Sequence, residues 1–354
     1  MEKKIQMIFD ELKLLIMEVE DCKQLQRNIV YQIAIDRLYQ NVIIDSLLSM
    51  KTFEEKLIQE IKRNITWTYD EMEYYFYQIP KKQYVFYESL MGFQIDQKRR
   101  IGEYEFIPCF DIAVSMLRNR DRNTGFVRVE CCAKDFRKAQ ELAEHKLHVL
   151  FYTLIFLQGY ITYNSFGDRF EFHDRTSIYG YTYEQDEGRE IPFQRQDEKM
   201  IKLNDLFLQV HHSEAIIKLI SKDLLTEMER KLLMGIVWGG MVFTQCQLEF
   251  ALMQGITAIE NILDQKKTEL IDAMFFLVGD NLLSRQAIKR NMLKILEIKE
   301  DLLDGVKIKN IGTELFMVMK YLQVLVCLFC ENENLKKIQT KKELERYISV
   351  LKYS

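Results

Sequence analysis

The chain has 354 residues, 48% of them hydrophobic and 29% charged, so it is long enough to bury a large core in two or three domains. Its 49 basic and 53 acidic residues give a net charge of -4, which excludes a global positive field for nucleic acid or anionic membranes. Seven irregularly spaced cysteines do not form the pattern of a disulfide framework and favour a reducing, cytoplasmic environment.

Two regions of different character make up the first 200 residues. Residues 1–80 have apolar side chains at helical spacing, such as Ile5, Ile8 and Leu12, and predict an N-terminal helical region. Residues 81–200 predict a central α+β module, because short β-branched and aromatic runs flank one long helical pattern. We expect strands in 83–90, 102–110, 124–133, 159–166 and 168–175, and a helix over 135–158 with Asp135 as its N-cap.

The remaining residues, 201–354, predict a domain made almost wholly of helices, since no proline follows Pro192. The fold class is therefore mostly α with a central α+β module. The longest apolar run, 315–330, is interrupted by Lys320 and Gln323 and predicts a buried helix, with no membrane segment. The helices are expected at about 202–220, 222–237, 240–265, 267–280, 284–304, 311–331 and 341–352.

The common catalytic patterns are absent from the sequence. It contains no glycine-rich phosphate loop, no GxSxG and no HExxH. Cys327 and Cys330 form a lone CxxC in an apolar helix, and His145 and His148 are only two ligands on one face, so we predict no metal site and no cofactor.

A strip of basic residues lies in the central module, with aromatic residues between them. Such a strip suits single-stranded RNA or DNA. Acidic residues nearby, including Glu103, Glu105 and Glu130, dilute the charge, and a solvated edge of mixed sign is the favoured interpretation. The candidate nucleic-acid-binding residues are Arg99, Arg100, Arg118, Arg120, Arg122 and Arg128.

The order of three segments near the C-terminus carries a family resemblance. A helix ending in AIENIL contains Glu260, the segment KILEIKEDLLDG follows about 36 residues later, and a long apolar helix comes after it. This order resembles the HEPN superfamily, specifically its abortive-phage-resistance (ApeA-like) branch, over about residues 225–350. The resemblance implies a C-terminal HEPN-like helical bundle. It also implies metal-independent RNA cleavage by an Arg-x4-His motif at a dimer interface.

Both chemical positions depart from that motif. By position, Lys299 stands for the arginine, Asp304 for the histidine and Gly305 for the glycine that follows it. Lysine lacks the planar fork that grips a phosphate, and an ionised aspartate cannot donate a proton to a leaving oxygen. Lys299 at the edge of the apolar stripe can instead reach Glu260 as a structural ion pair. We therefore expect no catalytic residues.

The resemblance then implies a noncatalytic HEPN-like component of a prokaryotic antiviral or toxin-related system. Its partner is expected to be another protein or a second copy, bound through the C-terminal domain. One alternative is a metal-independent ribonuclease with an atypical Lys299 and Asp304 site, helped by Arg285, Lys289 or Arg290. The other is an RNA- or DNA-binding adaptor that uses the basic strip, and an unrelated helical bundle with a chance match is also left open.

Overall fold

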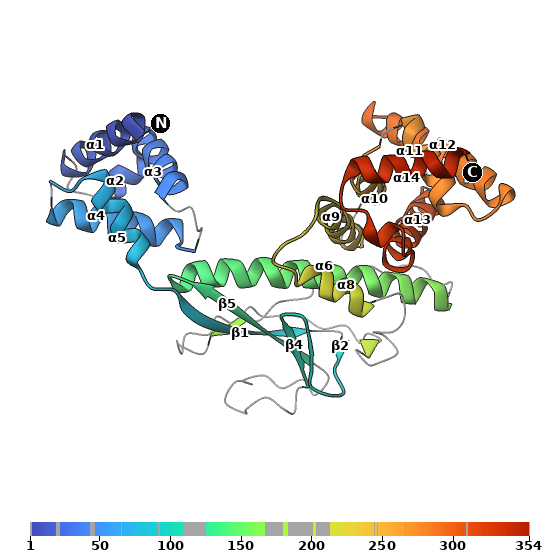
Figure 1. The fold of residues 1–354 in the computed structure, drawn as a ribbon, viewed down its shortest axis with the longest axis horizontal. Coiled ribbons are helices and arrows are strands. Elements are labelled where there is room, and N and C mark those ends of the chain that lie inside the picture. The colour runs from blue at the N-terminus through green and yellow to red at the C-terminus, as the bar shows by residue number, and fades with distance from the viewer. Residues whose placement is uncertain are drawn as a thin grey trace. The chain divides into compact units, whose positions relative to one another are not determined.

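The computed structural model divides the chain into two compact units (Figure 1). The first contains the N-terminal helices together with residues 129–145. The second contains residues 93–108 and 146–166 and the C-terminal helices. The described residues are 2–18, 22–42, 47–64, 66–90, 93–108, 125–166, 180–182, 201–202, 213–243, 245, 247–265, 267–308 and 311–353.

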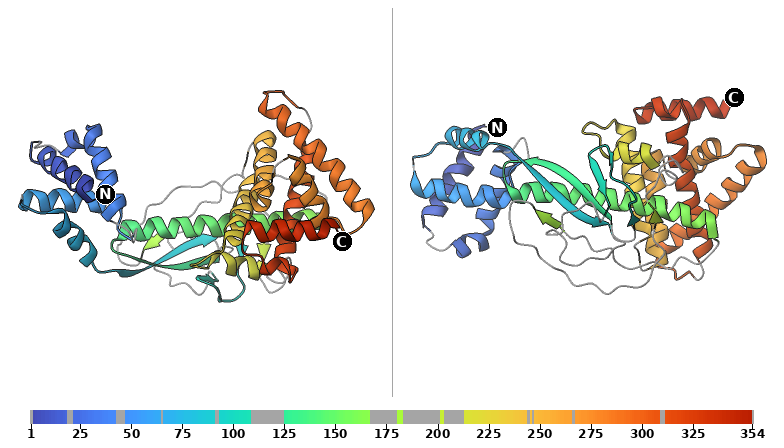
Figure 2. Two further views of the ribbon diagram at one scale, coloured as in Figure 1. Left: turned by 45° about the horizontal axis from the view of Figure 1, so that its top comes forward. Right: turned by 90° about the horizontal axis from the view of Figure 1, so that it is seen from below.

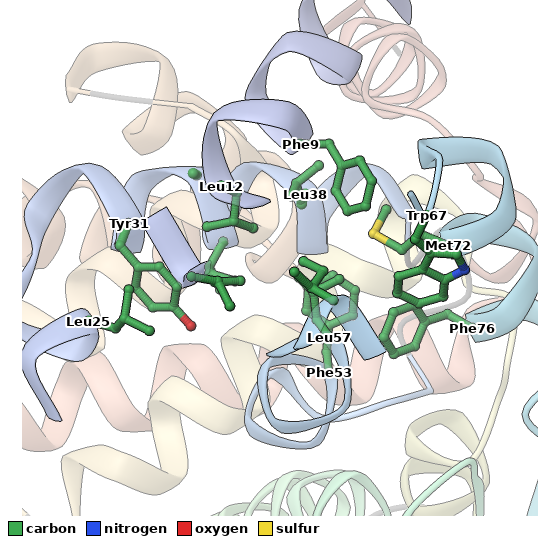
Figure 3. Packing of buried hydrophobic residues seen from close by; sticks show 14 of the residues in the cluster. Phe9, Leu12, Leu25, Tyr31, Leu38, Phe53, Leu57, Trp67, Met72 and Phe76 are labelled. Atoms are coloured by element: carbon green, nitrogen blue, oxygen red, sulfur yellow. The ribbon is translucent and has the colours of Figure 1, made fainter. Parts of the chain in front are cut away.

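The N-terminal helices pack around an aromatic core (Figure 3), as the helical spacing predicts. Phe9 lies edge-on to Trp67, and the rings of Phe53 and Phe76 are tilted by 45° with their centroids 4.6 Å apart. The helices are α1 (Glu2–Glu18), α2 (Cys22–Arg27), α3 (Ile29–Val42), α4 (Met50–Arg63) and α5 (Tyr69–Gln78).

Local capping fixes where α4 and α5 begin. Ser49 accepts a hydrogen bond from the backbone N–H of Thr52 at the start of α4. Thr68 and Glu71 form a reciprocal capping box at the start of α5. Both arrangements satisfy backbone donors that the first helical turn leaves without partners.

A small sheet follows α5, with strand order β3-β4-β5-β1-β6. The chain changes from helix to strand at residues 79–81. The domain boundaries expected at residues 80 and 200 stay predictions. β4 pairs antiparallel with both β3 and β5, while β2 pairs with β7 in a separate parallel ribbon. The strands are β1 (Lys82–Leu90), β2 (Phe93–Gln94), β3 (Arg99–Ile101), β4 (Tyr104–Ile107), β5 (Gly125–Ala133), β6 (Gly180–Thr182) and β7 (Ile201–Lys202).

The long helix α6 (Phe136–Phe166) follows β5. Asp135 caps it as predicted, because its Oδ1 accepts from the backbone N–H of Lys138 at 3.0 Å. The strand expected at 159–166 is wrong, since α6 continues through it. Extending an existing helix adds one hydrogen bond per residue, which here outweighs the β preference of those residues. The strand expected at 168–175 lies outside the described residues.

Helices make up the described C-terminal part of the second unit, so the mostly α class with a small α+β part is confirmed. Figure 2 shows them as one group. They are α8 (Ser213–Ile220), α9 (Glu227–Val242), α10 (Leu248–Leu263), α11 (Lys267–Val278), α12 (Leu282–Leu303), α13 (Gly312–Glu331) and α14 (Lys341–Tyr353), with a short 3-10 turn at η4 (Leu335–Lys337).

Three helix boundaries differ from those predicted. Residue 202, expected in a helix, lies in strand β7, and residues 222–226, also expected in a helix, precede α9, which begins at Glu227. The break expected near residue 238 lies instead between Val242 and Leu248. Gly239 and Gly240 remain inside α9 because they face α6 closely: an added Cβ on Gly240 would overlap the carbonyl oxygen of Tyr152. These glycines allow α9 to pack closely against its neighbours and do not form a turn.

Helix α13 extends beyond the apolar run at residues 315–330. Among the described residues it is the one helix long and apolar enough to cross a membrane, and 56% of its most apolar stretch is buried inside the structure. It packs against α9, α10, α11 and α12. Its buried side chains, including Leu322, Leu325 and Val326, are those of a core helix.

We predict that Gly240→Ala destabilises the second unit by about 1–3 kcal/mol, because the added methyl group forces α9 away from the main chain of α6. Chemical denaturation followed by circular dichroism measures the change. The matched control is Gly312→Ala in α13, where nothing lies within 4 Å of an added Cβ. Equal stability of the two variants would contradict close packing at Gly240.

Candidate functional site

The predicted ion pair between Lys299 and Glu260 is present and joins α12 to α10. Lys299 Nζ donates to Glu260 Oε1 at 2.6 Å. The side chains are only 18% and 13% exposed, so solvent screens the pair weakly. The cation in the arginine position of the motif is therefore held by a carboxylate inside the helical bundle.

Asp304 and Gly305 end α12 as an ordinary C-terminal cap. Gly305 has a φ of +79° and its N–H donates to the carbonyl of Leu302, while the N–H of Val306 donates to the carbonyl of Asp301. This pair of bonds is the Schellman motif, which favours glycine because side chains rarely adopt a positive φ. The glycine is explained by helix termination alone.

The two chemical positions do not converge on one site. Lys299 turns toward α10, whereas Asp304 is exposed at the end of α12. Five residues along a helix correspond to about 140° of rotation, which accounts for the separation. Glu297, Glu300 and Asp301 are also exposed beside Asp304. This end of α12 repels a phosphodiester.

The first half of α12 has the opposite character. A shallow hollow of about 460 Å³ lies along the outer face of α12. Figure 2 shows α12 in orange among the C-terminal helices. Lys289 and Arg290 are both exposed there. The sequence analysis named these two cations but missed the apolar Leu293, which lies between them and Glu297. Leu293 follows Arg290 by three residues, a spacing that indicates a shared face of the helix. The hollow is lined by Gln286, Lys289, Arg290, Leu293, Lys294 and Glu297.

Two further cations of α12, the partly buried Arg285 and the exposed Lys294, contact neighbouring segments. Arg285 donates through Nε to the carbonyl of Gly279 at 3.0 Å, and its guanidinium lies over the rings of Phe275 and Phe276. Lys294 donates to Glu314 Oε1 at 2.5 Å. Burial raises the pKa of Glu314, but the hydrogen bond and charge of Lys294 together with a backbone hydrogen bond outweigh it, and the net shift is downward. Arg285 and Lys294 therefore have structural partners.

The basic strip of the central module is only partly described. Arg99 and Arg100 lie on β3, an edge strand of the described sheet, while Arg118, Arg120 and Arg122 lie outside the described residues. Arg100 sits opposite Glu105 in the β3–β4 register.

Glu105 neutralises part of this strip. Its carboxylate takes ion pairs from Arg128 at 3.3 Å and from Lys98 at 3.0 Å. Burial raises the pKa of Glu105, and the hydrogen bond from Lys98 with the charge of Arg128 turns the net shift downward. The described part of the strip is an edge of mixed sign.

In the described part of the chain, Cys327, Cys330 and the histidines of α6 do not form a metal-binding or thiol-reactive site. Burial raises the pKa of Cys327 to about 12 and that of Cys330 to about 11, which keeps both thiols protonated. His145 and His148 are exposed on α6. No group of three or more histidine, cysteine or acidic side chains there could hold a metal ion.

Comparison with protein-family models, with curated protein sequences and with solved structures finds no match for this chain.

We predict that Glu260→Gln destabilises the second unit by about 1–3 kcal/mol, because it leaves the Lys299 ammonium poorly paired among buried side chains. Glu260→Leu combined with Lys299→Met should recover most of the loss, since apolar replacement of both partners removes the unpaired charge. Urea denaturation of Glu260→Leu, Lys299→Met and the double variant forms the mutant cycle. Additive losses would show that the two side chains do not interact.

Proposed function

We propose that the chain is a noncatalytic, HEPN-like interaction component of a prokaryotic antiviral or toxin-related system. The ion pair between Lys299 and Glu260 supports this role, because Lys299 is the cation that stands at the arginine position of the motif and it is bound by Glu260. The order of α10, α12 and α13 agrees with the helix order from which the resemblance was drawn.

The geometry argues against RNA cleavage in this part of the chain. Scission needs a cation that meets the phosphate and a proton donor for the leaving oxygen. Lys299 already donates to Glu260, and Asp304 lies on another side of the helix among exposed carboxylates. Of the cations in the ribonuclease alternative, Arg285 is held by Gly279. Lys289 and Arg290 remain exposed and share their hollow with the carboxylate of Glu297.

Protein binding is the activity that the outer face of α12 favours. This face combines exposed charges with the apolar Leu293 in a shallow hollow, which suits the side chains of another protein. Nucleic acid is a weaker candidate because the acidic residues continue along the same helix. The proposed partner therefore binds through the C-terminal helical part of the second unit.

We predict that the purified protein does not cleave labelled single-stranded RNA, with either EDTA or Mg²⁺ present. The rate of product formation should equal that of Lys299→Met and of the double variant Lys289→Ala with Arg290→Ala, because none of these cations acts in catalysis. Gel analysis of product measures the rate. Lys307→Ala, at an exposed lysine beyond the end of α12, is the matched control.

One outcome of this assay would contradict the noncatalytic role. Cleavage by the wild-type protein that is lost in Lys299→Met or in the double variant, yet kept in Lys307→Ala, would establish the ribonuclease alternative. Circular dichroism of each variant separates a loss of chemistry from a loss of folding.

A further inference from the structure

An exposed pair of aromatic rings lies on the outer face of α5. The helix has five aromatic residues, and three of them, Tyr69, Tyr75 and Phe76, pack against other rings of the first unit. Tyr74 and Tyr77 are instead 66% and 73% exposed. Because they are three residues apart, they share one face of the helix with about 5–6 Å between their Cβ atoms. The core does not use these two rings, so a ligand can stack on them.

Basic residues lie close to this pair, where the chain passes from α5 into β1 (Figure 1). Lys81 and Lys82 stand between the helix and the strand and are exposed. Lys134, which follows β5, donates to the carbonyl oxygen of Phe76 at 2.9 Å, and its Nζ lies 5.7 Å from the centroid of the Tyr77 ring. A cation in this place satisfies a carbonyl at the end of α5 and is attracted to the face of the ring.

The acidic residues of α5 lie toward its other end. The chain carries no acidic residue from 74 to 87. Asp135 adjoins Lys134, but each of its carboxylate oxygens accepts a backbone N–H. The acid before Lys134 on β5 is Glu130, about 13 Å away along the extended strand. The aromatic pair therefore has cations on the side toward β1, while the acids that precede it on α5 are Asp70, Glu71 and Glu73.

We propose that this surface of the first unit binds single-stranded nucleic acid. Bases stack on the rings of Tyr74 and Tyr77, since every base has a flat face, and the lysines neutralise the phosphates of the same strand. The separation of the two rings suits neighbouring bases of an extended strand. Lys134 lies over one face of the Tyr77 ring, and the exposure of that side chain leaves the rest open. The surface consists of Tyr74, Tyr77, Lys81, Lys82 and Lys134.

This inference goes beyond the role proposed for the C-terminal helices, because it concerns residues of the first unit alone. It also differs from the basic strip of the central module. There Glu105 takes ion pairs from two of the cations, whereas beside Tyr77 the cation Lys134 is bound by carbonyl oxygens. A carbonyl leaves the positive charge of Lys134 in place.

The neighbours of the pair favour nucleic acid over a protein partner. Lysine is depleted in protein interfaces, and charged residues are depleted at their centres. Amide and ammonium groups suit phosphate oxygens and the edges of bases. A single strand fits better than a duplex, because a duplex holds its bases inside the stack. The exposed residues that follow Tyr77 are Gln78, Pro80, Lys81, Lys82 and Gln83.

Binding of labelled oligonucleotides to the full-length protein tests the proposal. The probes are oligothymidylate and oligouridylate of about 16 nucleotides, the upper end of common single-strand site sizes, in EDTA and followed by fluorescence anisotropy. Tyr74→Ala with Tyr77→Ala should weaken binding by about tenfold or more, because each lost stack contributes measurably. Tyr74→Phe with Tyr77→Phe keeps the rings and should bind as the wild type does. An unlabelled duplex of the same length should compete poorly.

Salt dependence tests the part of the lysines. Two phosphate contacts predict that the logarithm of the binding constant falls with the logarithm of the salt concentration with a slope of about -1.4. Lys81→Gln with Lys82→Gln should remove most of this slope. The matched controls are Lys4→Gln with Lys51→Gln, at exposed lysines of the same unit, and Tyr353→Ala, at a tyrosine that is 86% exposed on α14. Both should bind as the wild type does.

Three results would overturn the proposal. They are a wild type that binds neither probe at about 50 mM salt, where electrostatic attraction is weakly screened, tyrosine-to-alanine variants that bind normally, and a duplex that competes as well as the single strand. The first result would leave the aromatic pair to a protein partner. Circular dichroism of each variant shows whether it is folded. Because EDTA and anisotropy report binding and not product, the noncatalytic role fails separately, in the cleavage assay.

Discussion

The ion pair between Lys299 and Glu260 is the interaction on which the functional interpretation depends. It ties α12 to α10 at 2.6 Å between side chains that are mostly shielded from water. An unpaired charge in such a place is costly, so the two residues constrain one another. A lysine fixed in this manner cannot follow a substrate. In the structure Lys299 contacts the carboxylate of a neighbouring helix.

The exposed face of α12 differs in composition from its buried face. Ile288, Met292 and Ile295 fix α12 in the bundle, while the opposite side exposes Leu293 among charged residues of both signs. Such a division into an apolar buried face and a polar exposed face is that of an amphipathic helix.

Much of the fold could be predicted from local pattern. The cap at Asp135, the N-terminal helices and the long C-terminal helices follow from short-range rules. The pairing of Lys299 with Glu260 joins residues 39 positions apart and is expected from the place of Lys299 at the edge of an apolar stripe. The break between α9 and α10 could not be placed, because Gly239 and Gly240 act through contacts with α6 that are distant in sequence. The separation of Lys299 from Asp304 follows from helix geometry alone.

The crossing of α9 over α6 limits which side chains α9 can carry there. At Gly240 the backbone of α9 lies against the backbone of Tyr152 in α6, where no rotamer change can make room for a side chain. The neighbours of Gly239 are the side chains of Phe156 and Leu322. A larger residue at 240 therefore has to displace a helix backbone, whereas one at 239 has only side chains to displace.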